Sequence, residues 1–328
     1  MKSLSRRAVC AGGLAAIAGG RAAPAQAAEK LTYLFPAPDF LPAFAPFHLA
    51  RSRGYFGAAG LDVEFRVGRG GADVAKQVAL DNVELGGATV DTVMVVRANG
   101  LGVKAVCLLG NGALYQIVVR KDANVHSLAD LKGKKVGVLG FQDNGFYNLQ
   151  GALATVGLTR DDVSIEAVGP AGVVQLMVSG DLQAISAVPE STAAIEAAGV
   201  PVDVYPITQF FPGMAQAVVA SEAAIAKKGE MIRAFNVATL KAIRDIEADP
   251  DGMAKAYTAA VTQHAGKEAM IADIMRRYAR LVYKSGDGRL GTFDKQRVQT
   301  MADFYLKAGI LTQAERAEDV FTNDLVPS

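Results

Sequence analysis

Short β-branched runs and longer segments with apolar residues at helical spacing alternate along this chain. The strand-like runs in the first part are LTYLFPA (31–37), LDVEFRV (61–67) and VKAVCLL (103–109). The helical segments between them cover residues 40–56, 73–83 and 91–99. This alternation predicts an α/β fold with largely parallel sheets.

The same alternation restarts at YQIVVRKD (115–122) and continues to about residue 207. From residue 230 to the end the pattern is almost wholly helical, with breaks at 249–252 and 285–288. Two α/β units of similar size, the second inserted into the first, predict two lobes around a ligand cleft, with a helical C-terminal region.

The first 27 residues have a different pattern. A basic start with Lys2, Arg6 and Arg7 precedes a weakly apolar run over 8–20, which ends at the small-residue site Ala25-Gln26-Ala27. The paired arginines are typical of a twin-arginine export signal, although an ordinary secretion signal with a positive end also fits. We therefore expect cleavage near Ala27 and a periplasmic protein.

The charges of the 328-residue chain are nearly balanced, with 34 basic and 33 acidic residues. This balance favours neither a nucleic acid nor a membrane surface as partner. Cys10 lies near the start of the apolar run rather than after it, so a lipid anchor is not expected there, and Cys107 alone remains after cleavage. Its apolar surroundings, VKAVCLLG, predict a buried structural thiol rather than a nucleophile.

Three segments then carry a resemblance to a known family. They are HLARSRGYFGAAGLDVEF (48–65), SLADLKGKKVGVLG (127–140) and GLTRDDVSIEAVGPAGVVQLMVSGDLQAISA (157–187). In this order they resemble the solute-binding proteins of nitrate, sulfonate, taurine and thiamine-pyrimidine-precursor ABC importers (SsuA/THI5-like, NMT1-like). The resemblance covers nearly all of residues 31–240.

This resemblance implies a type II periplasmic-binding-protein fold, in which the chain crosses between lobes near residues 117–120 and 214–219. Lobe 1 would then comprise residues 28–117 plus 218–328, and lobe 2 residues 118–217. It also implies a monomer without a cofactor, which captures a small molecule by lobe closure and delivers it to an inner-membrane ABC permease with its ATPase.

In this family the ligand contacts lie on the loops that follow the strands, where helix N-termini converge. Carried over to this sequence, the candidate ligand-binding residues are Asp39, Phe40, Gly70, Gly71, Thr89, Asp91, Phe141, Gln142, Asp143, Asn144, Glu190, Phe210 and Phe211.

Each candidate also has a purely structural interpretation. Asp39, Asp91 and Asp143 or Asn144, like Asp73, can be helix N-caps that bind only their own helix. Gly70 and Gly71 can simply form a turn. Phe40, Phe44 and Phe47 have helical spacing that also suits a hydrophobic core.

Several of these loops carry an acid (Asp39, Asp91, Asp143 and Glu190), and we expect none to carry arginine or lysine. Carboxylates repel an anionic ligand and compete with it for helix N-terminal amides. Together with the frequent aromatic residues, they favour a planar, neutral or amino-bearing ligand resembling an aminopyrimidine. Taurine, another sulfonate or nitrate remains the alternative.

No catalytic residue or metal site is expected. The loop GFQDNGFYNL (140–149) lacks the Gly-Lys-Ser/Thr of a phosphate-binding loop, and His48, His126 and His264 have no metal or triad spacing. Pyrimidine synthases share the fold and use a cysteine-rich site, but QFFPG (209–213) holds no cysteine. A pyrimidine-synthase-like enzyme and a ligand sensor that binds a partner protein are therefore less favoured hypotheses than a solute-binding protein.

The amphipathic segment IADIMRRYARLVYK (271–284) belongs to the helical C-terminal region. We expect it to pack on lobe 1, with docking of a partner by its basic face as the alternative.

Overall fold

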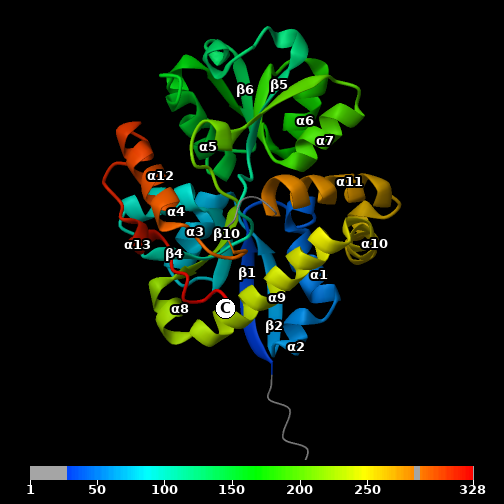
Figure 1. Cartoon of the computed structure of the whole chain (residues 1–328), viewed down its shortest axis with the longest axis vertical. Helices are drawn as coiled ribbons and strands as arrows, with labels where there is room; N and C mark the ends of the chain where they lie inside the picture. Colours follow the sequence, from blue (N-terminus) through cyan, green and yellow to red (C-terminus); the bar gives the residue numbers. More distant parts are fainter. Residues whose placement is uncertain (1–27, 284–288, 328) are drawn as a thin grey trace, which may run out of the picture.

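The computed structural model describes residues 28–283 and 289–327. The expected export signal (1–27) and the break expected at 285–288 lie outside these ranges. The chain forms two lobes, each built on a five-stranded sheet (Figure 1). This arrangement confirms the predicted two-lobed α/β fold.

The lobe 1 sheet has the strand order β2-β1-β3-β10-β4. Its strands are β1 (Glu29–Phe35), β2 (Leu61–Val67), β3 (Leu85–Thr89), β4 (Val103–Leu108) and β10 (Gln216–Ser221). Strand β1 runs parallel to β2 and β3, whereas β10 runs antiparallel to β3 and β4 because it brings the chain back from lobe 2.

The lobe 2 sheet has the order β7-β6-β8-β5-β9. Its strands are β5 (Gln116–Arg120), β6 (Lys135–Val138), β7 (Ser164–Ala167), β8 (Ala184–Ala187) and β9 (Val202–Pro206). Here β6 runs parallel to β7 and β8, and the entering strand β5 is antiparallel to both neighbours. Each sheet is therefore mixed, and its antiparallel strand marks a passage between lobes.

Helices cover the sheets of both lobes and form the C-terminal region. Lobe 1 carries α1 (Ala45–Ser52), α2 (Tyr55–Ala58), α3 (Gly71–Ala79) and α4 (Val90–Ala98); lobe 2 carries α5 (Asn144–Ala154), α6 (Gly169–Ser179) and α7 (Pro189–Ala197). The C-terminal helices are α8 (Glu222–Lys227), α9 (Gly229–Ala248), α10 (Pro250–Ala260), α11 (Glu268–Tyr278), α12 (Lys295–Lys307) and α13 (Ala317–Val320). A π-helical turn, Ala279–Tyr283, extends α11.

The lobe 1 core is an aromatic cluster between β1 and the helices α1 and α9. The Tyr33 ring lies 4.4 Å from Phe47 and 5.3 Å from Phe235. Phe44 and Phe47 are buried, as their core interpretation requires, and Cys107 is buried too. The long helix α9 therefore joins the C-terminal region to lobe 1 through hydrophobic burial.

The chain passes between the sheets through residues 109–115 and 207–215. The crossings expected at 117–120 and 214–219 fall largely inside β5 and β10, which belong wholly to lobe 2 and lobe 1, respectively. Both passages come earlier because the apolar runs that follow them pair as complete strands. The glycines Gly110 and Gly112 lie in the first connection, and Gly213 lies in the second.

The two lobes touch through backbone and small side chains at the start of α3. The Ala72 amide donates to the Gln142 carbonyl of lobe 2 at 3.1 Å. A Cβ on Gly70 would lie 2.4 Å from the same carbonyl oxygen, and one on Gly71 would lie 1.9 Å from the Asn144 Oδ1. Gly70 and Gly71 therefore do more than form a turn, because the absence of their side chains permits the close approach of the two lobes.

Replacing Gly71 with alanine should hold the lobes apart, because the new methyl group occupies the position of the Asn144 amide. We expect the radius of gyration, about 19 Å for a compact chain of this size, to increase by roughly 1 Å in small-angle X-ray scattering. The matched control is Gly57→Ala, where a Cβ meets nothing within 4 Å. An unchanged radius for G71A would contradict the direct contact between lobes.

Candidate functional site

Three buried carboxylates lie where the lobes face each other. Asp91 is in the first turn of α4, Asp143 is the N-cap of α5, and Glu190 is in the first turn of α7. These helices follow β3, β6 and β8, so the carboxyl ends of strands from both sheets position the acids. Their exposed fractions are 1%, 4% and 9%.

Asp91 connects three separate segments of the chain. Its carboxylate accepts hydrogen bonds from the Thr92 amide at 2.8 Å and from the Thr89 hydroxyl. It also accepts from the Tyr305 hydroxyl of α12 at 2.9 Å and from the Asn148 Nδ2 of lobe 2 at 3.2 Å. Burial raises the pKa of Asp91, while these donors oppose the rise. Thr89, not Asp91, is the N-cap of α4.

Asn144 of lobe 2 reaches the start of α4 in lobe 1. Its Oδ1 accepts from the Thr89 amide at 3.2 Å and from the Thr92 hydroxyl at 2.9 Å. With Asp91 already bound to the Thr92 amide, oxygens of the protein itself occupy these donors. An anionic ligand at this helix end would have to displace them.

Asp143 caps its own helix, which is the structural interpretation considered for it. It accepts from the Gly145 amide at 2.7 Å and from the Tyr115 hydroxyl at 3.2 Å. Burial raises its pKa to about 6 against these hydrogen bonds, and the charge of Asp91 contributes to the increase.

Glu190 of lobe 2 is held by lobe 1. Its Oε2 accepts from the Tyr278 hydroxyl of α11 at 2.5 Å, and its Oε1 accepts from the Ala43 amide at 3.4 Å. Burial raises its pKa. On the same pair of helices Arg277 forms an ion pair with Glu196 at 2.8 Å. Arg277 of α11 thus contacts lobe 2, and Figure 1 shows α11 directly beside that lobe.

In the described parts of the chain, Asp91, Asp143 and Glu190 form no ion pair with lysine or arginine. Their partners are hydroxyl and amide donors. The interface between the lobes is therefore rich in acid and poor in neutralising charge. Such a region attracts groups that donate hydrogen bonds or carry positive charge.

A pocket of about 230 Å³ opens beside this cluster and has walls from both lobes. Lobe 1 contributes Pro36–Pro38 and Gly68–Gly70, and lobe 2 contributes Leu139, Gly140, Asp143 and Pro170. Arg69 is among these residues, so the expectation that no cleft loop carries a basic residue is wrong. Its side chain is 83% exposed and lies 3.6 Å from Asp73, which places the charge at the rim.

Asp39 and Phe40 lie in the lobe 1 loop that precedes Ala43. The Asp39 carbonyl is hydrogen-bonded to His48 at 2.9 Å. The Phe40 carbonyl accepts from the Tyr257 hydroxyl at 2.6 Å and is bonded to His264 at 2.7 Å. These bonds fix the loop that faces the start of α7.

The predicted lobe 2 aromatic residues occupy different environments. Phe141 is 50% exposed and meets the Phe146 ring edge-on at 5.4 Å, beside the exposed Gln142. Phe210 is partly buried near Tyr205. Phe211 is buried and stacks on the Phe304 ring of α12 at 5.7 Å, which ties the second connection to the C-terminal region.

Sequence reasoning missed the polar residues that complete the cluster: Tyr115, Asn148, Tyr278 and Tyr305. Tyr278 and Tyr305 look like ordinary core positions of amphipathic helices, and only their hydroxyl groups mark them as polar partners. Three buried lobe 2 atoms have no hydrogen-bond partner, namely Asn148 Oδ1, Ser186 Oγ and Thr192 Oγ1. Unsatisfied groups of this kind are costly, about 1–3 kcal/mol each.

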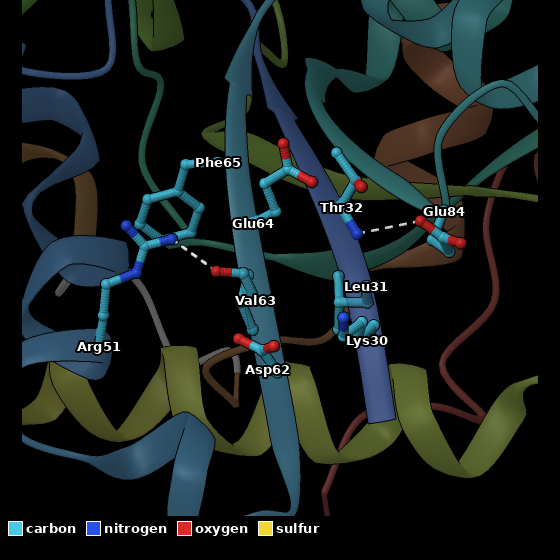
Figure 2. A pocket seen from close by; sticks show the side chains of 9 residues that line it. All are labelled: Lys30, Leu31, Thr32, Arg51, Asp62, Val63, Glu64, Phe65 and Glu84. Atoms are coloured by element: carbon cyan, nitrogen blue, oxygen red, sulfur yellow. Dashed lines mark hydrogen bonds between the residues drawn. The ribbon is translucent and has the colours of Figure 1, made fainter. Parts of the chain in front are cut away.

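A second pocket, of about 670 Å³, lies on the lobe 1 sheet beside β1 and β2 (Figure 2), and all of its lining residues belong to lobe 1. Arg51 donates to the Val63 carbonyl at 2.6 Å and lies 3.5 Å over the Phe65 ring. Glu84 accepts from the Thr32 amide at 2.9 Å. All of this pocket lies in one lobe, and neighbouring backbone groups already bind the charged groups of Arg51 and Glu84. The interlobe pocket is therefore the stronger candidate for a ligand site.

Neither a metal site nor a membrane span is found in residues 28–283 and 289–327. No group of three histidine, cysteine or acidic side chains there is arranged to hold a metal ion. No helix in these ranges is long and apolar enough to cross a bilayer.

Comparison with known proteins gives one family match. Residues 41–253 match the family described as NMT1/THI5 like. The riboflavin-binding protein RibY of Chloroflexus aurantiacus is 27% identical over 295 residues, which are 87% of this chain and 82% of that protein. The 4-amino-5-hydroxymethyl-2-methylpyrimidine phosphate synthase of Aspergillus parasiticus is 27% identical over 144 residues, 44% of this chain and 41% of the synthase.

Among solved structures, the alkanesulfonate-binding protein SsuA of Xanthomonas axonopodis pv. citri, bound to MOPS, superposes with a TM-score of 0.70. The alignment covers 89% of this chain and 98% of SsuA at 16% identity. This similarity shows that the two chains share the periplasmic-binding-protein fold.

Asp143→Asn should increase stability at neutral pH. The pKa of Asp143 in the folded protein, about 6, lies above its ordinary value of 3.8. Asp143 therefore contributes fully to the free energy of unfolding below about pH 4, where it is protonated. This contribution is lost as the pH rises through 6. Asparagine is an equally good N-cap without the buried charge, so we expect a gain on the order of 2 kcal/mol at pH 7.5.

Urea unfolding between pH 4.5 and 8 measures this effect. The control is Asp122→Asn at an exposed site, where the Arg120 guanidinium lowers the pKa of the acid. D122N should show no gain at pH 7.5. A D143N curve parallel to that of the wild type would show that Asp143 does not titrate in this range.

Proposed function

We propose, on the premise that the chain belongs to the NMT1/THI5-like family, that it is the substrate-binding component of an ABC importer. Its ligand would be a small planar organic molecule, neutral or amino-bearing and aminopyrimidine-like. The observation that carries the ligand class is the group of buried carboxylates between the lobes, none of which is ion-paired in the described parts of the chain.

Closure of the two lobes is the proposed mode of capture. Donors and acceptors from both lobes meet at Asp91, Asn144 and Glu190. A ligand that contacts both lobes binds the closed state more tightly and shifts the population toward it. The permease with its ATPase would then recognise the closed form, with the protein acting as a periplasmic monomer after removal of residues 1–27.

The charge of the interface favours hydrogen-bond donors over anions. A ring amino group can donate to Asp143 or Glu190, whereas a sulfonate or nitrate would lie beside uncompensated carboxylates. The donors at the start of α4 are already bound to Asn144 and Asp91. Arg69 at the rim of the interlobe pocket suits an anion, but its ion pair with Asp73 reduces that attraction.

The names of the relatives support a planar heteroaromatic ligand. One relative is named for riboflavin binding, and another for synthesis of an aminopyrimidine phosphate. The interlobe pocket of about 230 Å³ lies below the 300–1,000 Å³ typical of drug-sized ligands. A single ring therefore suits it better than a flavin, which would require wider separation of the lobes.

Binding without catalysis is the proposed role, although one relative is a synthase. The segment 209–213, where a cysteine cluster would fall, contains no cysteine. Cys107 is buried in β4, and burial raises the pKa of its thiol, which disfavours the reactive thiolate. A ligand-sensing protein that contacts a receptor would use the same closed surface.

Thermal unfolding with a ligand panel tests the ligand class. The panel comprises 4-amino-5-hydroxymethyl-2-methylpyrimidine, riboflavin, taurine, MOPS and nitrate. A ligand at about a thousand times its Kd adds roughly 4 kcal/mol and should raise the Tm by several degrees. We expect an increase with the planar rings. An increase restricted to the sulfonates or nitrate would overturn the ligand class and leave the fold unaffected.

Glu190→Gln tests the role of charge in the interface. We expect affinity for an amino-bearing ring to fall about 10- to 100-fold, because a hydrogen bond to a charged group contributes about 1.5–3 kcal/mol. The matched control is Glu196→Gln on the same helix, where the acid is paired with Arg277 at the surface. Isothermal titration calorimetry gives both values, and equal losses in the two variants would rule out a direct role for Glu190.

A further inference from the structure

Arg297 of α12 is bonded to both connections between the lobes. Its Nη1 donates to the Asn111 carbonyl at 2.7 Å, and its Nη2 donates to the Gly213 carbonyl. Asn111 lies in the first connection (109–115) and Gly213 in the second (207–215). One guanidinium group therefore joins two segments that are about a hundred positions apart in the sequence.

Other contacts hold the same two segments together. The Leu109 amide donates to the Gln216 carbonyl at 2.8 Å, and the Leu114 amide donates to the Met214 carbonyl at 3.2 Å. The Gly112 amide donates to the Val282 carbonyl of the π-helical turn at 3.0 Å. The two connections thus run side by side and are docked against the C-terminal region.

We propose that Arg297 is a positioning residue for lobe closure: it anchors both connections to lobe 1 and thereby fixes where they pivot. This inference deepens the proposed function, because it concerns the same closing motion. With Asn111 and Gly213 held by Arg297, and Gly112 bonded to Val282, rotation is confined to residues 113–115 and 207–212. The motion then has a defined axis.

The hydrogen bonds of Arg297 differ in position from the contacts at the cleft. The bonds from Asn148 to Asp91 and from Tyr278 to Glu190 join opposite lobes, so they must break when the lobes separate. The two acceptors of Arg297 lie on the connections themselves, on the lobe 1 side of the pivot. These bonds can persist in both the open and the closed states.

Arginine suits this task because its planar guanidinium presents several N–H donors in a fixed geometry. A lysine at 297 can reach one carbonyl but cannot hold both in the same geometry, and methionine retains the apolar stem without any donor. R297M therefore removes the anchor, whereas R297K only weakens it.

The test measures the distance between lobes by double electron–electron resonance in the full chain. Exposed alanines on each lobe carry the spin labels through Ala58→Cys and Ala198→Cys, with Cys10→Ser; Cys107 is buried and should not react. The parent is compared with R297M, R297K and a control, Arg233→Met. Arg233 also donates to two backbone carbonyls, those of Asp324 and Val326, but neither belongs to a connection.

We expect R297M to broaden the distance distribution and to add a population longer by several ångströms, with R297K intermediate. R233M should lose comparable thermal stability and keep the parental distribution. If R297M does not fold, the R297K distribution decides. The inference is overturned if the Arg297 variants match the parent, or if R233M broadens the distribution to the same extent.

A G71A variant in the same labelled chain separates this inference from the proposed function. If G71A opens the lobes and the Arg297 variants do not, the role of Arg297 fails while closure stands. If the distance between the lobes is the same in the parent, in G71A and in every other variant, the lobes do not move. The proposed capture by closure then fails.

Discussion

The cost of burying carboxylates between two lobes is the constraint on which this arrangement depends. Asp91, Asp143 and Glu190 lose hydration there, and burial raises the pKa of each. Hydroxyl and amide groups offset that cost, and several come from the opposite lobe or from the C-terminal helices. Asp91 and Glu190 therefore keep all of their hydrogen bonds only while the two lobes are close together.

The C-terminal region links that state to the motion of the lobes. Its helix α9 is anchored in the lobe 1 aromatic core, so the helices that follow it are fixed with respect to lobe 1. From this base α11 supplies Tyr278 to Glu190, and α12 supplies Tyr305 to Asp91. The same α12 supplies Arg297 to both connections. Helices of the C-terminal region thus reach both the cleft and the pivot.

Local sequence patterns predicted the parts of this structure that depend on local physics. The alternation of strand and helix periods gave two α/β lobes, and the apolar settings of Phe44, Phe47 and Cys107 indicated burial, which the structure confirms. The acids at the starts of helices were also recognisable, because such positions follow the strands. The passages between lobes were placed too late, because strand pairing, rather than local composition, determines where a strand begins.

The sequence by itself determined the fold class, the family and the acidic character of the loops, because each depends on residue types at short spacing. Only the tertiary structure decided which side chains meet: Tyr305 with Asp91, Asn144 with the start of α4, and Arg297 with both connections. It also placed Arg69 at the rim of the pocket beside Asp73. These partners are far apart in the chain, and the packing of separate elements brings them together, which no local pattern encodes.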